Sequence, residues 1–199
     1  MRFWGCALAL AFGCLPARGS AERFRVLLET SKGPLVIEVH RDRAPRAADR
    51  FRQLVSAGYY DDSRFFRVVS GRWAQFGIAG QPSAAAAWRG ATFRDEDPGP
   101  RQSNLRGAVA FAFAVPDGRT TQVFISLADN SRLDAMGFVP FGRVVEGMEV
   151  ADALNGEYGE TSGGGIRAGG QEPIYQGGNA WLDAHFPRLD RIVLARVVP

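Results

Sequence analysis

The chain has 199 residues, of which 46% are hydrophobic and 23% charged, and its formal net charge is +3. A chain of this length and composition can bury the core of one domain without a disulfide framework. Lys32 is its only lysine, and its arginines form no basic run or stripe, which argues against a nucleic-acid partner.

The first 21 residues have the pattern of a targeting segment. Arg2 supplies a positive start, residues 3–15 are uncharged and largely apolar, and Gly19-Ser20-Ala21 offers small residues for cleavage before Glu22. The apolar run is shorter than the roughly 20 residues that a membrane-spanning helix needs. We therefore expect a signal peptide over 1–21, no membrane span, and an exported domain over 22–199 that is periplasmic or secreted.

A second export hypothesis stays open at this point. Ala11-Phe12-Gly13-Cys14 loosely resembles a lipoprotein cleavage box, which would leave Cys14 carrying a lipid anchor. The other cysteine, Cys6, lies in the same segment, so removal of 1–21 would leave a domain without thiols, which avoids wrong disulfides in an oxidising compartment.

The remaining chain predicts many short strands and two helices. Residues 44–57 have helical spacing, with Asp42 as a candidate cap and Gly58 as the stop, and 147–154 predict a second, short helix. Residues 81–88 are expected to be irregular, and 157–179 to form a long glycine-rich excursion. Extended runs are predicted at 23–30, 35–40, 64–69, 73–78, 108–114, 122–127, 139–145 and 191–198. This pattern favours a mainly β fold, a closed eight-stranded antiparallel β-barrel capped by two α-helices.

One charged residue stands out within these runs. Arg67 lies mid-strand in an otherwise apolar stretch, and an arginine stays charged and is costly to bury without a partner. Gln75 lies eight residues further on, in the next extended run, where a hairpin would bring its amide beside the guanidinium. A purely structural alternative is that Arg67 pairs with Asp95 or Glu96 on a barrel wall.

Several motifs along the chain, taken in order, resemble the cyclophilin family of peptidyl-prolyl cis-trans isomerases, and one fragment, 133–141, is similar to a bacterial branch of it. The matching pieces run from the first predicted helix to the last third of the chain: 45–51 with Leu54, 58–61, 65–68, Gln75, 104–107, 121–125, 133–134 and 141–148.

The resemblance implies a role for particular residues. Arg67 matches the catalytic arginine and Gln75 the glutamine beside it. Six residues match substrate-binding positions. Phe124 and Leu133 match walls of the proline pocket, and Ala112 and Gln122 match contacts to the substrate backbone. Trp73 and Phe138 are aromatic residues near the pocket. Independently, the alternation in 122–127 turns Phe124 away from the core-facing set of Val123, Ile125 and Leu127.

The sequence also departs from the family pattern. Arg72 stands where a phenylalanine usually forms the pocket floor, Phe113 stands where asparagine is usual, and 136–138 lacks a histidine often found near the pocket. Because a guanidinium is expensive to desolvate, we expect Arg72 to point to solvent while Trp73 supplies the apolar surface.

The expected function is isomerisation of X–Pro bonds in exported proline-containing polypeptides, by a monomer that needs no cofactor or metal. The alternative, which Arg72 and the absent histidine favour, is a weakly active or inactive module that binds extended proline-containing segments. A barrel enclosing a small ligand is disfavoured, because the inward-facing residues are bulky and should fill the interior.

Overall fold

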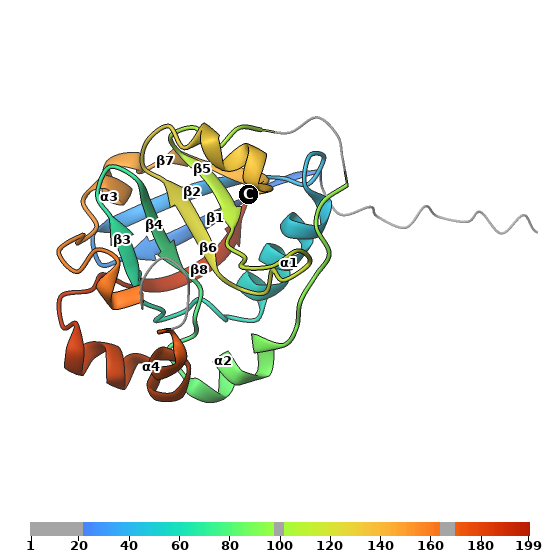
Figure 1. Ribbon diagram of the computed structural model, residues 1–199. Helices are drawn as coiled ribbons and strands as arrows, with labels where there is room; N and C mark the ends of the chain where they lie inside the picture. The colour runs from blue at the N-terminus through green and yellow to red at the C-terminus, as the bar shows by residue number, and fades with distance from the viewer. Residues whose placement is uncertain (1–21, 98–101, 164–169) are drawn as a thin grey trace, which may run out of the picture.

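The computed structural model describes residues 22–97, 102–163 and 170–199, so the predicted signal peptide and Cys14 lie outside the described residues. Eight antiparallel strands form one curled sheet in the order β3-β4-β6-β5-β7-β2-β1-β8 (Figure 1). Their bounds are β1 Arg23–Thr30, β2 Gly33–His40, β3 Arg67–Val69, β4 Trp73–Phe76, β5 Ala108–Phe111, β6 Val123–Ser126, β7 Pro140–Glu146 and β8 Ile192–Val198. All eight predicted strands are confirmed, several of them shorter than predicted.

The sheet is an open half-barrel, so the prediction of a closed barrel was wrong. Its two edge strands are β3 and β8, and β3 has only three residues. The predicted strand began at Arg64, but that residue makes only an isolated antiparallel bridge to Arg191. Without a continuous ladder between β3 and β8, the eight strands cannot close.

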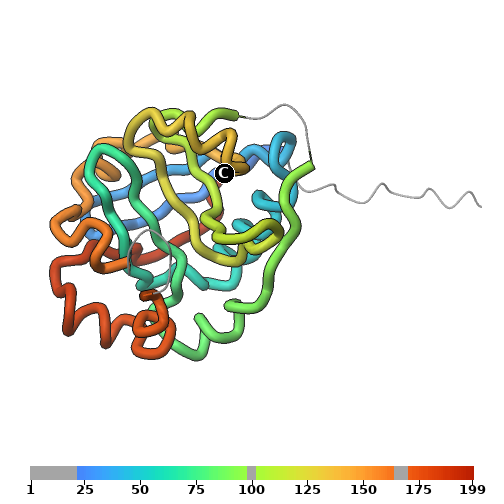
Figure 2. Tube along the Cα trace, viewed as in Figure 1, coloured from blue at the N-terminus to red at the C-terminus, as the bar shows by residue number. Residues whose placement is uncertain are grey.

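Four α-helices are present in the described part of the chain, two more than predicted: α1 Pro45–Ser56, α2 Pro82–Arg89, α3 Met148–Asp152 and α4 Glu172–His185. Helices α1 and α3 are the predicted pair and lie on opposite sides of the sheet in Figure 1. The stretch 81–88, expected to be irregular, forms α2. The predicted excursion 157–179 contains the start of α4. Helix α4 packs beside α2 below the sheet, as the ribbon in Figure 1 and the tube in Figure 2 both show.

The N-terminus of α1 is capped in a different way from the prediction. Asp42 does not cap it, and the cap position Ala44 offers no side-chain oxygen. Instead, the Glu96 carboxylate accepts a hydrogen bond of 2.8 Å from the Ala47 backbone N–H. A carboxylate at this end satisfies an otherwise unpaired amide and complements the helix dipole.

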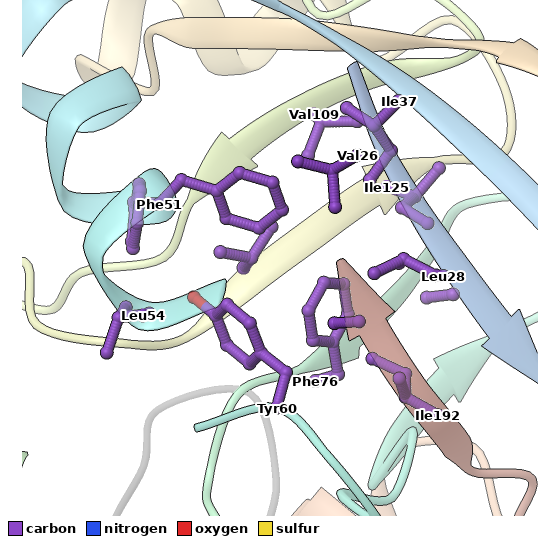
Figure 3. Packing of buried hydrophobic residues seen from close by; sticks show 14 of the residues in the cluster. Val26, Leu28, Ile37, Phe51, Leu54, Tyr60, Phe76, Val109, Ile125 and Ile192 are labelled. Atoms are coloured by element: carbon purple, nitrogen blue, oxygen red, sulfur yellow. The ribbon is translucent and has the colours of Figure 1, made fainter. Parts of the chain in front are cut away.

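The hydrophobic core fills the inside of the curled sheet. In Figure 3 the Phe51 ring of α1 points toward the strands that carry Val26, Val109 and Phe76. The Tyr60 hydroxyl donates to the Thr121 carbonyl oxygen at 3.0 Å, so its burial leaves no polar group unpaired. Among the described residues, no helix is long and apolar enough to cross a membrane.

Candidate active site

Strand pairing brings three of the predicted site residues into one row. Arg67 of β3 is directly opposite Gln75 of β4, Gln75 is opposite Phe124 of β6, and Phe124 is opposite Ala110 of β5. Directly opposed residues in antiparallel strands point to the same face of the sheet. The predicted hairpin between Arg67 and Gln75 is therefore confirmed.

The Arg67 guanidinium is held on several sides. Its Nη1 donates to Gln75 Oε1 at 2.7 Å, and its Nε and Nη2 donate to the two oxygens of Glu160 at 2.6 and 2.9 Å. The guanidinium carbon also lies 4.9 Å from the ring centroid of Trp73, and only 12% of the side chain is exposed. This nearly buried arginine is thus paired with a carboxylate and an amide, which offset the cost of burying its charge.

The structural alternative for Arg67 was wrong. Asp95 forms an ion pair with Arg119. Glu96 lies near Arg46 and caps α1. Neither carboxylate pairs with Arg67.

A chain of amide hydrogen bonds continues from Arg67. Because a guanidinium can only donate, Gln75 must present its oxygen to it, which leaves the Gln75 Nε2 to donate to Gln122 Oε1 at 2.8 Å. The Gln122 Nε2 then donates to Gln171 Oε1 at 2.8 Å and to the Tyr175 hydroxyl at 3.1 Å. Gln171 Nε2 also donates back to Gln122 Oε1 at 3.3 Å, so the orientation set at Arg67 passes through Gln75 to a reciprocal Gln122–Gln171 pair.

Beside this network lies an apolar cluster that is separate from the main core. Trp73, Ala110, Phe124 and Leu133 are at least nine-tenths buried in it, and Val69, Ala112 and Phe138 pack against it. The separation follows from the two-residue period of β6, since Val123 and Ile125 point into the main core and Phe124 points the other way. All eight predicted site residues therefore belong either to the hydrogen-bond network or to this cluster, which we call the Trp73 cluster.

The position of Arg72 agrees with the expectation. The residue is exposed, and its guanidinium carbon lies 5.5 Å from the centroid of the Trp73 ring. The Arg72 carbonyl oxygen accepts hydrogen bonds from Leu127 N–H and Asn130 Nδ2, which fixes the backbone while the side chain stays in solvent. Trp73, not Arg72, supplies the apolar surface.

Phe138 is held at the edge of the cluster by its neighbours. The ring lies 5.7 Å from Phe124 and 4.5 Å from Phe113, between centroids. Asn104 Nδ2 donates to the Phe138 carbonyl oxygen at 2.7 Å. Arg119 donates to the preceding carbonyl at 2.6 Å and stacks on Phe113, and burial lowers the pKa of this arginine. The two phenylalanines thus fill the corner where the family pattern has asparagine and histidine.

Sequence reasoning missed Glu160, Gln171 and Tyr175. Each contacts a predicted site residue from a segment far along the chain, and no local pattern around them indicates this contact. These contacts become visible only in the structure, where the segment at Gly159 pairs with Val68 of β3. Within the described ranges, no three histidine, cysteine or acidic side chains gather closely enough to hold a metal ion.

Known proteins resemble this chain over most of its length. Peptidyl-prolyl cis-trans isomerase A of Dickeya dadantii is 34% identical over 145 residues, which are 70% of this chain and 75% of that protein. Peptidyl-prolyl cis-trans isomerase-like 1 of Rhizopus delemar is 36% identical over 136 residues, which are 67% of this chain and 81% of that protein. Relatives therefore come from both bacteria and eukaryotes.

The fold also matches solved structures. A cyclophilin-type peptidyl-prolyl cis-trans isomerase of Cryptosporidium parvum superposes with a TM-score of 0.62 at 19% identity, covering 89% of this chain and 98% of that one. A second structure of it, in the presence of the dipeptide Ala-Pro, gives a TM-score of 0.61 at 20% identity, covering 88% and 99%. The family model described as "Cyclophilin type peptidyl-prolyl cis-trans isomerase/CLD" matches residues 25–173. The chain belongs to this family of cyclophilin-type isomerases.

Proposed function

We propose that this chain catalyses cis–trans rotation about X–Pro bonds, with Arg67 as the catalytic donor and Gln75 as its partner. The observation that carries the proposal is the juxtaposition of a fixed guanidinium with an apolar cluster. Arg67 stacks on Trp73, which is itself packed against Phe124 and Leu133.

The chemistry needs little more than these two features. Amide resonance opposes rotation with a barrier of about 18–20 kcal/mol. A guanidinium N–H that donates to the prolyl nitrogen favours the twisted state, in which the nitrogen lone pair is no longer delocalised. No bond breaks, so the reaction requires no nucleophile and no general base. Each 1.4 kcal/mol or so of preferential stabilisation of the twisted state increases the rate about tenfold.

The Trp73 cluster is the proposed binding surface for the prolyl ring. It combines Trp73, Phe124 and Leu133 with Ala112 and Phe138 at its edge. A similar fold solved in the presence of Ala-Pro supports proline-containing peptides as the ligand class. Gln122 belongs to the proposed site as the residue that continues the hydrogen-bond network, and Ala112 as a backbone contact.

The proposed substrates are exported polypeptides, which would place this chain in an exported, bacterial branch of the family. The support is the signal-peptide pattern of residues 1–21, with Cys14 as the lipid-anchored alternative. We expect a monomeric protein that begins near Glu22. Mass spectrometry of the protein from cells tests this. An intact Met1 contradicts export, and a lipid mass on Cys14 supports the lipid-anchored alternative over cleavage before Glu22.

One observation favours a second candidate, a module that binds proline-containing segments with little turnover. Glu160 already occupies two of the guanidinium donors of Arg67. An isomerisation assay with the purified protein and a short Ala-Pro peptide separates the two candidates. The isomerase predicts rate acceleration proportional to enzyme concentration, whereas binding of the peptide without acceleration would support the module.

A further inference from the structure

Besides Gln75 and Trp73, the Arg67 guanidinium contacts Glu160, a residue to which the family resemblance gives no role. The contact is bidentate: Nε donates to one carboxylate oxygen at 2.6 Å and Nη2 to the other at 2.9 Å. Bidentate arginine–carboxylate pairs fix orientation as well as charge, because two parallel hydrogen bonds define the plane of the guanidinium.

The backbone holds Glu160 in place. The preceding residue, Gly159, forms an antiparallel bridge with Val68, the neighbour of Arg67 on β3. Glu160 also begins a short turn, since its carbonyl oxygen accepts the Gly163 N–H at 3.2 Å. The carboxylate therefore reaches Arg67 from a segment that is itself paired to the strand.

The same turn packs against the aliphatic stem of the arginine. A Cβ atom built on Gly163 would lie 2.7 Å from Cβ and 2.9 Å from Cδ of Arg67, closer than real Cβ atoms come. Only glycine allows this approach. Glu160, Gly163, Gln75 and Trp73 thus confine the arginine on four sides.

This confinement leaves donors free for a substrate. A guanidinium has five N–H donors. Among the described residues, Glu160 takes the Nε–H and one on Nη2, and Gln75 takes one on Nη1, so these contacts leave one N–H on each terminal nitrogen. Those two are the donors available to a prolyl nitrogen or its neighbouring carbonyl.

We infer that Glu160 is a positioning residue for the isomerase reaction, which fixes the Arg67 guanidinium against Trp73 with its two free N–H groups presented to the substrate. The inference rests on the proposed function, because it gives Glu160 a role only through Arg67. The ion pair with Glu160 offsets part of the positive charge of Arg67. In return, the Arg67 N–H donors are already oriented when the peptide binds.

The test is a double-mutant cycle with a matched control. Glu160→Ala should lower kcat/KM by roughly 10- to 100-fold, the usual loss when a catalytic group is misplaced by about an ångström. The loss should fall mainly on kcat, because the Trp73 cluster that binds the ring is untouched. In an Arg67→Ala background, Glu160→Ala should have almost no further effect, because the two residues act as one unit.

Glu157→Ala is the control. Glu157 lies in the same segment and makes the same kind of bidentate pair, with Arg188, at the surface. Its removal should leave kcat/KM unchanged. A spectroscopic readout completes the test: the Arg67 Nε–H resonance, identified by its loss in Arg67→Lys, should be protected from exchange in the wild type and lose that protection in Glu160→Ala.

The outcomes separate this inference from the proposed function. An unimpaired or faster Glu160→Ala enzyme, beside an inactive Arg67→Ala enzyme, overturns the positioning role and would make Glu160 neutral or a brake. An equal loss in Glu157→Ala would also overturn it, since the effect would then belong to the segment as a whole. Wild-type activity in Arg67→Ala would instead overturn the proposed function itself.

Discussion

Removing the Trp73 ring should impair the isomerase much more than removing the neighbouring Arg72 side chain. Trp73 is buried in a cluster with Phe124 and Leu133, and the guanidinium carbons of Arg67 and Arg72 lie 4.9 and 5.5 Å from its ring centroid. Trp73→Ala therefore removes both an apolar surface for the prolyl ring and the platform on which Arg67 stacks.

The magnitude can be estimated from those two losses. The stacking of Arg67 on the ring is worth about 1 kcal/mol for a partly desolvated pair. Two methylene groups of a prolyl ring that lose their apolar contact cost about 1.6 kcal/mol. The sum of roughly 2.6 kcal/mol corresponds to a loss of about 80-fold in kcat/KM. Arg72→Ala removes only an exposed stacking contact, so its effect should stay below about fivefold.

The assay is protease-coupled isomerisation of a short Ala-Pro peptide, with thermal melting to confirm that each variant is folded. Trp88→Ala is the matched control, because Trp88 is a partly buried tryptophan on α2 that packs against the main core and not against the Trp73 cluster. It should leave kcat/KM unchanged. If Arg72→Ala cripples the enzyme and Trp73→Ala does not, the binding surface is misplaced and Arg72 contacts the substrate.

Other expected outcomes follow from the same structure. Arg72→Phe should hold or raise kcat/KM, since it adds apolar surface beside Trp73; a loss above tenfold in the peptide assay contradicts this. Burial raises the pKa of Glu96, so its contribution to stability is fully present below the ordinary glutamate pKa and is lost as the pH rises through the higher folded-state value. Glu96→Gln, which keeps an acceptor for the Ala47 N–H, should abolish that dependence, so a difference in Tm that does not change with pH contradicts it. Phe51→Ala should lower the free energy of unfolding by about 3–5 kcal/mol in urea titrations, as is usual for a fully buried phenylalanine.

Much of the fold could be predicted because local patterns and tertiary burial agree. The alternation through Phe124 predicts which side of β6 faces the core, and Pro45 and Gly58 bracket α1 within a residue or two. The open edge could not be predicted, because nothing in the run from Arg64 shows that the ladder begins only at Arg67. Between Arg64 and the start of β3, the only pairing toward the other edge strand, β8, is the single bridge between Arg64 and Arg191 in the described part of the chain.

Helix α2 was missed for a different physical reason. Its four alanines favour a helix, but only Ala85 is buried, so the sequence lacks the wide apolar stripe that identifies a helix on a core. Helix α2 packs beside α4, whose own pattern is interrupted at Gly178, where φ is +55°. Neither helix is recognisable until the other is placed. The structure brings all eight predicted site residues into the network or the Trp73 cluster, and their roles stay a prediction. Glu160 could not be predicted, because its contact with Arg67 depends on the path of the chain.

The most direct test of the central claim is the isomerisation rate of Arg67→Ala beside Arg67→Lys and the wild type. Removing a preorganised donor to the twisted state should lower kcat/KM by roughly 10²–10³. Arg67→Lys should recover little of it, because an ammonium on a flexible stem cannot bind Gln75 and Glu160 and still present fixed N–H groups to the substrate. A folded Arg67→Ala enzyme with wild-type activity would show that this guanidinium does not catalyse the reaction.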